Sequence, residues 1–158
     1  MSKIAFIFPG QGAQTCGMGK DFYEAFPVCR EVFEEASKAS GLDIPALLGF
    51  SVPELCFEPN DRLDITEYTQ AAMVTTSIAM MKVLEENGVK PDVAAGLSLG
   101  EYCALAAARV MSEEDAITTV RQRGIFMQEE VPAGEGAMAA ILALDAAVIE
   151  EVTADIDG

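Results

Sequence analysis

The sequence predicts an α/β fold in which a few short strands lie among many helices. Residues 3–8 are rich in β-branched and aromatic residues and stop at a glycine-containing loop, which is typical of a fully buried strand. A second apolar run, residues 93–95, leads directly into Gly96 and a strongly helix-forming segment. With residues 138–144 this makes about three strands, fewer than a complete doubly wound sheet contains.

Helical patterns fill most of the remaining chain. Pro27 suits a first helical position, Asn87-Gly88 is a stop signal, and Ser112 begins a segment that resembles a capping box. Helices are expected over residues 18–25, 27–41, 66–86, 101–108, 113–130 and 145–156, the last capped by Asp145.

The segments between these helices are expected to be irregular. Residues 44–57 are interrupted by Pro45, Gly49 and Pro53, which predicts short turns, and a polar loop follows at 58–64. Residues 132–136 are predicted to be a linker before the strand at 138–144.

Composition narrows the classes of function. The 158 residues are 51% hydrophobic, which is enough for one domain with a real core, and no run is long enough to span a membrane. A net charge of −16 argues against nucleic-acid binding. Four cysteines without paired spacing, and no histidine, argue against a metal site and predict reduced thiols in the cytoplasm.

Residues 96–100 read Gly-Leu-Ser-Leu-Gly, the nucleophile elbow pattern, in the context of strand, turn and helix. The turn requires small residues two before and two after Ser98, and Gly96 and Gly100 meet that need. The following helix directs its positive dipole end at the serine, and the Leu99 amide could bind an oxyanion. The alternative is a tight turn without chemistry, because the pattern arises by chance in roughly a few per cent of such chains.

Two further observations bear on chemistry. The loop at 9–12 follows the first strand but matches neither nucleotide-binding fingerprint, so by itself it is equally well an ordinary loop. A serine nucleophile needs a neighbouring base, yet the chain has no histidine, and its lysines lie in surface-like patterns.

Several blocks together resemble the malonyl-CoA:acyl carrier protein transacylase family, in that family's order and spacing. They are residues 8–14 (FPGQGAQ), 69–70 (TQ), 96–101 (GLSLGE), 123–124 (RG), 127–128 (MQ) and 132–141 (PAGEGAMAAI). The resemblance covers the chain from Lys3 onward. It implies that the chain corresponds to the N-terminal half of a member of this family. It implies an incomplete α/β-hydrolase-like large domain over 1–133, and over 134–158 the first strand and helix of a small ferredoxin-like α+β subdomain.

The resemblance also implies roles for matching residues. Ser98 would attack the thioester and carry the acyl group as a seryl ester, while Gln11 and Leu99 would present backbone amides to the oxyanion. Arg123 would bind the malonate carboxylate, and Gln70 would line the substrate site. The implied reaction, part of fatty-acid biosynthesis, moves a malonyl group from malonyl-CoA, a substrate and not a bound cofactor, to acyl carrier protein.

The chain departs from the family pattern at two positions. Leu97 stands where the family usually has histidine, which puts strict malonyl preference in question, and Ala71 replaces a usual proline. The family's general-base histidine would lie in the absent half. We therefore expect the isolated chain to be nearly inactive and to self-associate through uncovered apolar faces.

Two alternatives stay open at this point. One is a serine esterase or thioesterase built on the same elbow, which Arg123 argues against because a neutral acyl group has no use for an arginine. The other is a truncated, inactive chain that serves as an assembly partner.

Overall fold

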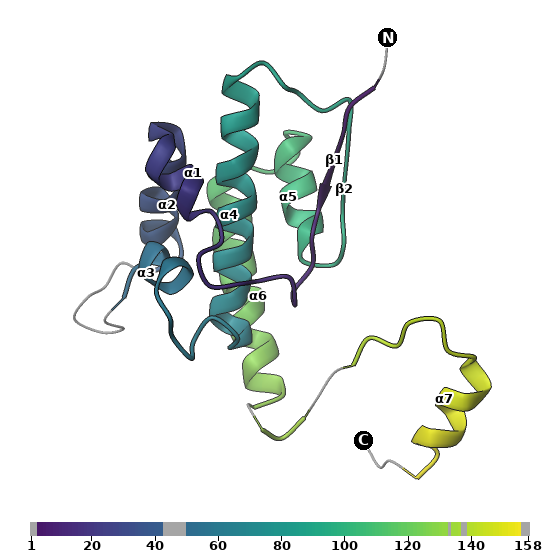
Figure 1. Ribbon diagram of the computed structural model, residues 1–158. Coiled ribbons are helices and arrows are strands. Elements are labelled where there is room, and N and C mark those ends of the chain that lie inside the picture. Colours follow the sequence, from purple (N-terminus) through teal and green to yellow (C-terminus); the bar gives the residue numbers. More distant parts are fainter. Residues whose placement is uncertain (1–2, 43–49, 133, 137–138, 156–158) are drawn as a thin grey trace.

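The computed structural model describes residues 3–42, 50–132, 134–136 and 139–155. It forms a helical body with a two-stranded sheet along one side, and a separate C-terminal helix (Figure 1). In chain order the elements are β1 (Ala5–Phe8), α1 (Lys20–Ala25), α2 (Pro27–Ala39), α3 (Val52–Phe57), α4 (Thr66–Glu86), β2 (Val93–Gly96), α5 (Gly100–Ala107), α6 (Glu113–Glu130) and α7 (Ala146–Thr153).

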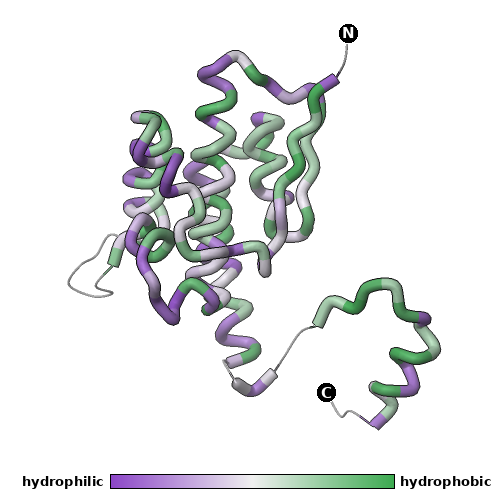
Figure 2. The backbone as a smooth tube through the Cα atoms, in the orientation of Figure 1, coloured by the Kyte–Doolittle hydropathy of each residue, from purple (hydrophilic) through white to green (hydrophobic). Residues whose placement is uncertain are grey.

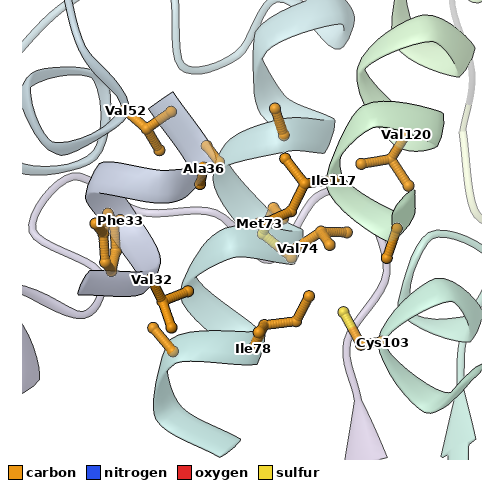
Figure 3. Close-up of a cluster of buried hydrophobic side chains, with 14 of the residues drawn as sticks. Val32, Phe33, Ala36, Val52, Met73, Val74, Ile78, Cys103, Ile117 and Val120 are labelled. Atoms are coloured by element: carbon orange, nitrogen blue, oxygen red, sulfur yellow. The ribbon is translucent and has the colours of Figure 1, made fainter. Parts of the chain in front are cut away.

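Helix α4 runs through the middle of the body and is surrounded by α2, α3, α5 and α6 (Figure 1). Because partners cover it on most sides, apolar residues occur all around it rather than in one stripe. Figure 3 shows the core where these helices meet, with side chains from α2, α4 and α6 interlocking: Val32, Phe33, Val74, Ile78, Ile117 and Val120. Although α4 has 21 residues, no helix among the described residues is both long and apolar enough to cross a membrane.

The two strands are parallel, with Ala5 opposite Val93 and Phe8 opposite Gly96. Phe6 and Phe8 point into the core, but Ile7 is 72% exposed and Val93 is 55% exposed. The prediction of a fully buried strand is therefore wrong for one face, because no described element packs on it. Figure 2 shows that the tube along the two strands is mostly green, the colour of hydrophobic residues.

Helix α3 corrects the prediction of short turns at its position. The Ser51 hydroxyl accepts a hydrogen bond from the Glu54 amide, and the Glu54 carboxylate accepts one from the Ser51 amide at 2.6 Å. Pro53 lies in the first turn, where its missing N–H is not needed, so it does not break the helix. The rest of that prediction, residues 44–49, lies outside the described residues.

The C-terminal segment also differs from expectation. Residues 139–144 form no strand in the described chain, and Ala143 adopts a left-handed φ of 56°. A strand needs a partner, and neither strand of the sheet lies beside this segment (Figure 1). Helix α7 forms as predicted, with the Asp145 carboxylate accepting a hydrogen bond from the Ala147 amide, but it buries none of its residues. The ferredoxin-like subdomain therefore stays a prediction, as does the boundary at 133.

The exposure of the outer face of the sheet can be tested by comparing an isoleucine on that face with one in the core. Ile78→Ala, at a fully buried position of α4, should lower the free energy of unfolding by about 2–5 kcal/mol. Ile7→Ala, at a 72% exposed position, should lower it by less than about 1 kcal/mol. Urea unfolding followed by circular dichroism measures both, and equal losses would mean that another molecule covers Ile7 in solution.

Candidate active site

The nucleophile elbow is present and its central residue is strained. Ser98 has φ of 50°, in the left-handed region that residues with a Cβ rarely adopt. The turn is closed by hydrogen bonds from the Leu97 amide to the Phe8 carbonyl at 3.1 Å and from the Gly100 amide to the Leu97 carbonyl at 2.9 Å. The predicted sequence of strand, sharp turn and helix is confirmed, and Ser98 is exposed at the N-terminus of α5.

Steric crowding explains the two glycines of the motif. A Cβ on Gly96 would lie 2.0 Å from the carbonyl carbon of Gly100, and one on Gly100 would lie 2.4 Å from the Phe8 carbonyl oxygen. No side chain fits at either position without moving the backbone. A Cβ on Gly10 would lie 2.9 Å from the Leu97 carbonyl oxygen, so the loop after β1 also approaches the elbow closely.

Arg123 is brought to the elbow by the packing of α6 on α4. A Cβ on Gly124 would lie 2.9 Å from the Cα of Glu67, which shows how closely the two helices approach. Beside this contact Arg121 donates to the Glu67 carboxylate at 2.9 Å and to its backbone carbonyl at 2.8 Å. With α6 held there, the half-buried Arg123 donates from Nη2 to the Ser98 hydroxyl at 3.3 Å. Arg121 thus makes a structural ion pair while Arg123 faces the serine.

The other predicted side chains lie next to Arg123. Gln70 is fully buried on α4, and its Oε1 accepts a hydrogen bond from Arg123 Nη1 at 2.6 Å. Its Nε2 donates to Gln11 Oε1 at 3.4 Å and to the Met127 sulfur at 3.3 Å. The side-chain nitrogen of Gln11, Nε2, donates in turn to the Thr66 hydroxyl at 3.0 Å. Sequence reasoning missed Thr66 and the sulfur contact, because both depend on how α4, α6 and the loop after β1 meet.

The backbone amides of Gln11 and Leu99 lie in the two turns that follow the paired strands. Since β1 and β2 are parallel, their carboxyl ends lie at the same edge of the sheet. Within the described residues, no hydrogen bond outside the helices and strands engages either amide. The Leu99 side chain is fully buried, whereas Leu97 is 72% exposed beside the serine.

The three buried cysteines are poor nucleophiles. Burial raises the pKa of the Cys29 thiol to about 11 and the pKa values of Cys56 and Cys103 to about 12. Near neutral pH these thiols therefore stay protonated and unreactive. In the described part of the chain, Ser98 has Arg123 as the hydrogen-bond partner of its hydroxyl and no carboxylate or amine base bonded to it. No three His, Cys, Asp or Glu side chains among the described residues gather as metal ligands.

Comparison with known proteins agrees with the motifs. The model of the acyl transferase domain family matches residues 5–158. The malonyl CoA-acyl carrier protein transacylase of Bacillus subtilis (strain 168) is 50% identical over 154 residues, covering 97% of this chain and 46% of the relative. The transacylase of Escherichia coli (strain K12) is 47% identical over 150 residues, covering 94% of this chain and 46% of the relative.

Solved structures give the same picture. The crystal structure of malonyl-CoA:acyl carrier protein transacylase from Xanthomonas oryzae pv. oryzae has a TM-score of 0.83 at 43% identity, covering 98% of this chain and 48% of the other. A complex of a type II PKS acyl-carrier protein with its malonyl-transacylase has a TM-score of 0.82 at 41% identity, with coverages of 98% and 48%. The resemblance in the motifs is confirmed, and the chain spans about half the length of the relatives it matches.

The strain at Ser98 can be measured by removing its hydroxyl in two ways. Ser98→Gly should be more stable to unfolding than Ser98→Ala by about 1 kcal/mol, since only glycine adopts a left-handed φ without cost. The control is Thr119, exposed inside α6, where the alanine variant should be the more stable one. Urea unfolding measures the stability of the glycine and alanine variants at each position. A more stable alanine variant at both positions would contradict a strained elbow.

Proposed function

We propose that this chain, which belongs to the acyl transferase domain family, carries the nucleophile of an enzyme that transfers a malonyl group from coenzyme A to acyl carrier protein in fatty-acid biosynthesis. The observation that carries this proposal is the position of Arg123, 3.3 Å from the hydroxyl of a serine on a strained elbow. A similar structure contains a malonyl-transacylase bound to an acyl-carrier protein, which supports that class of partner.

In the first half of the reaction, the Ser98 oxygen would attack the thioester carbonyl carbon of malonyl-CoA. Attack forms the C–O bond and moves the carbonyl electron pair onto oxygen, while a base takes the serine proton. Collapse of this tetrahedral intermediate breaks the C–S bond, and the proton passes from the base to the departing thiolate. The backbone amides of Gln11 and Leu99, free of other partners among the described residues, would donate to the oxyanion. In the second half, the carrier-protein thiol attacks the seryl ester: the C–S bond forms, the C–O bond to Ser98 breaks, and the thiol proton passes through the base to the serine oxygen.

Arg123 would select malonyl among acyl groups. The free carboxylate of malonate is joined to the thioester carbonyl through a single CH₂, so a guanidinium beside the serine oxygen can reach it. A planar guanidinium suits a carboxylate because it can donate two parallel hydrogen bonds. An esterase or thioesterase for neutral acyl groups gains nothing from this cation, so the position of Arg123 favours the transferase. Leu97, exposed beside the serine, stands where the family usually has histidine. This difference would affect how strictly malonyl is selected.

The general base would come from outside these 158 residues, because they contain no histidine. On this proposal the chain alone is nearly inactive. The exposed face of β1 and β2 is where a further polypeptide, or a second copy of the chain, would pack. This face also supports the second candidate, a chain that acts as an assembly partner. All four cysteines are free, in keeping with a reducing compartment such as the cytoplasm.

The function can be tested in a chimera in which residues 1–155 are followed by the part of the Bacillus subtilis relative beyond its aligned segment. We expect the chimera to transfer malonyl groups and Ser98→Ala to abolish transfer. The isolated chain should be slower by about 10²–10⁴-fold, the usual contribution of a general base. Transfer is measured as malonyl-loaded carrier protein.

In the same chimera without carrier protein, mass spectrometry should find one malonyl group on the peptide that contains Ser98. Ser112→Ala, which removes another exposed serine at the start of a helix, should leave this adduct in place. An adduct on a different residue, or an isolated chain as fast as the chimera, would contradict the proposal.

The role of Arg123 predicts a change of selectivity. Arg123→Ala should lower kcat/KM of the chimera for malonyl-CoA more than for acetyl-CoA, since only malonyl loses a charged hydrogen bond. Expressed as activation free energy, the difference between the two substrates should be about 1.5–3 kcal/mol. Arg30→Ala is the matched control: it removes hydrogen bonds to the backbone carbonyls of Tyr23 and Glu24, away from the contact between α4 and α6, and should leave the malonyl-to-acetyl ratio unchanged. Equal losses on both substrates in Arg123→Ala would show that this residue does not bind the carboxylate.

A further inference from the structure

The buried Gln70 side chain joins three parts of the candidate site that are far apart in sequence. It contacts Arg123 and Met127 on α6 and Gln11 in the loop after β1. Its relative exposure is 0%, so a substrate cannot reach it without opening the fold. A fully buried amide is costly unless its polar atoms are hydrogen-bonded, and here both the oxygen and the nitrogen have partners.

The direction of these hydrogen bonds is determined by chemistry. Arginine only donates, so the Gln70 oxygen must face Arg123 and the Gln70 nitrogen must face Gln11. The Gln11 oxygen therefore faces Gln70, and its nitrogen donates to the Thr66 hydroxyl at 3.0 Å. The result is a chain of donation from Arg123 through Gln70 and Gln11 to the Thr66 hydroxyl. The other terminal nitrogen of the guanidinium donates to the Ser98 hydroxyl.

The orientation of the Arg123 guanidinium depends on Gln70. An arginine side chain has several rotatable bonds, and its other contacts are weaker: the Ser98 hydroxyl is 3.3 Å away, and the guanidinium carbon lies 6.0 Å from the Tyr102 ring centre. The bond between Arg123 Nη1 and Gln70 Oε1 is short, at 2.6 Å, and charge-assisted. It comes from α4, the most enclosed helix of the body, so it fixes one side of the guanidinium and leaves Nη2 facing the serine.

We infer that Gln70 is a positioning residue that fixes two parts of the site relative to each other. These are the guanidinium of Arg123 and the loop whose Gln11 backbone amide would donate to the developing oxyanion. This inference rests on the proposed function for the meaning of both parts. It assigns Gln70 no substrate contact, in place of the expectation that it lines the substrate site. One amide, through its oxygen and its nitrogen, keeps the carboxylate site and the oxyanion site at a constant spacing around Ser98.

Two substitutions separate the two ends of the amide. Gln70→Leu removes all three side-chain hydrogen bonds, those with Arg123, Gln11 and Met127. Gln70→Glu keeps an acceptor for Arg123 but has no N–H to donate to Gln11. The control is Thr69→Val, a buried neighbour whose hydroxyl donates only to backbone carbonyls of Leu63 and Ile65. If Gln70→Leu does not fold, Gln70→Glu still tests the inference, because it must alter Gln11 and spare Arg123.

The first readout is NMR of the ¹⁵N-labelled 158-residue chain, which does not require activity. The Arg123 side-chain Nε–H signal is assigned from its loss in Arg123→Lys. In Gln70→Leu this signal should move to the position of a mobile arginine and the Gln11 backbone amide should shift. In Gln70→Glu the Arg123 signal should remain that of an ordered, hydrogen-bonded arginine while the Gln11 signals shift, and in Thr69→Val neither residue should change. Unchanged Arg123 and Gln11 signals in Gln70→Leu would overturn the inference.

The second readout is transfer by the chimera. Gln70→Leu should lower kcat/KM for malonyl-CoA by roughly tenfold or more, in line with the loss of a charged hydrogen bond, and lower that for acetyl-CoA less. Gln70→Glu should also disfavour malonyl, because its carboxylate competes for Arg123. Suppose that Arg123→Ala changes the malonyl-to-acetyl ratio of kcat/KM. Equal losses of kcat/KM on both substrates in Gln70→Leu would then overturn the inference. Failure of Arg123→Ala to change the ratio would instead count against the proposed function, while the NMR result would still decide the positioning role.

Discussion

The close approach of backbone to backbone at the elbow is the constraint on which the rest of the site depends. Gly96 and Gly100 lie within a distance that excludes any Cβ, and Gly100 touches the end of β1. Only with both glycines can the chain reverse direction between β2 and α5 and leave Ser98 exposed in a left-handed conformation. The same contact brings the loop after β1 beside the serine, so the positions of Ser98 and of the Gln11 loop depend on the same close approach.

Helix α4 connects this turn to the remainder of the molecule. It fills the centre of the core, and its N-terminal half carries Thr66, Gln70 and the Glu67 contact that holds α6 in place. The residues that would bind substrate, Arg123 and the loop amides, therefore rest on a rigid buried element instead of on one another. Such support is what a site needs to hold a flexible arginine at a fixed distance from a nucleophile.

Features set by local sterics could be predicted from the sequence, and features set by distant packing could not. The elbow was predictable because its requirements lie within five consecutive residues. The local signal for helix α3, Ser51 with Glu54, outweighs Pro53, because proline is tolerated in the first turn of a helix. The exposure of Ile7 could not be read from its strand, since a strand's pattern does not say what packs on it. The contact of Met127 with Gln70 depends on the crossing of two helices that are far apart in the chain.

The pairing of β1 with β2 has a consequence for how the molecule reaches its final form. The residues joined beside this pair, Ile4 and Asp92, are 88 positions apart, whereas the helices form from neighbours in sequence. Closing a loop of that length costs about 4 kcal/mol of chain entropy, so we expect the helical core to assemble early and the sheet late. Because the elbow is formed only when β1 meets the turn after β2, Ser98 would acquire its strained conformation as one of the last events of folding, on a scaffold already in place.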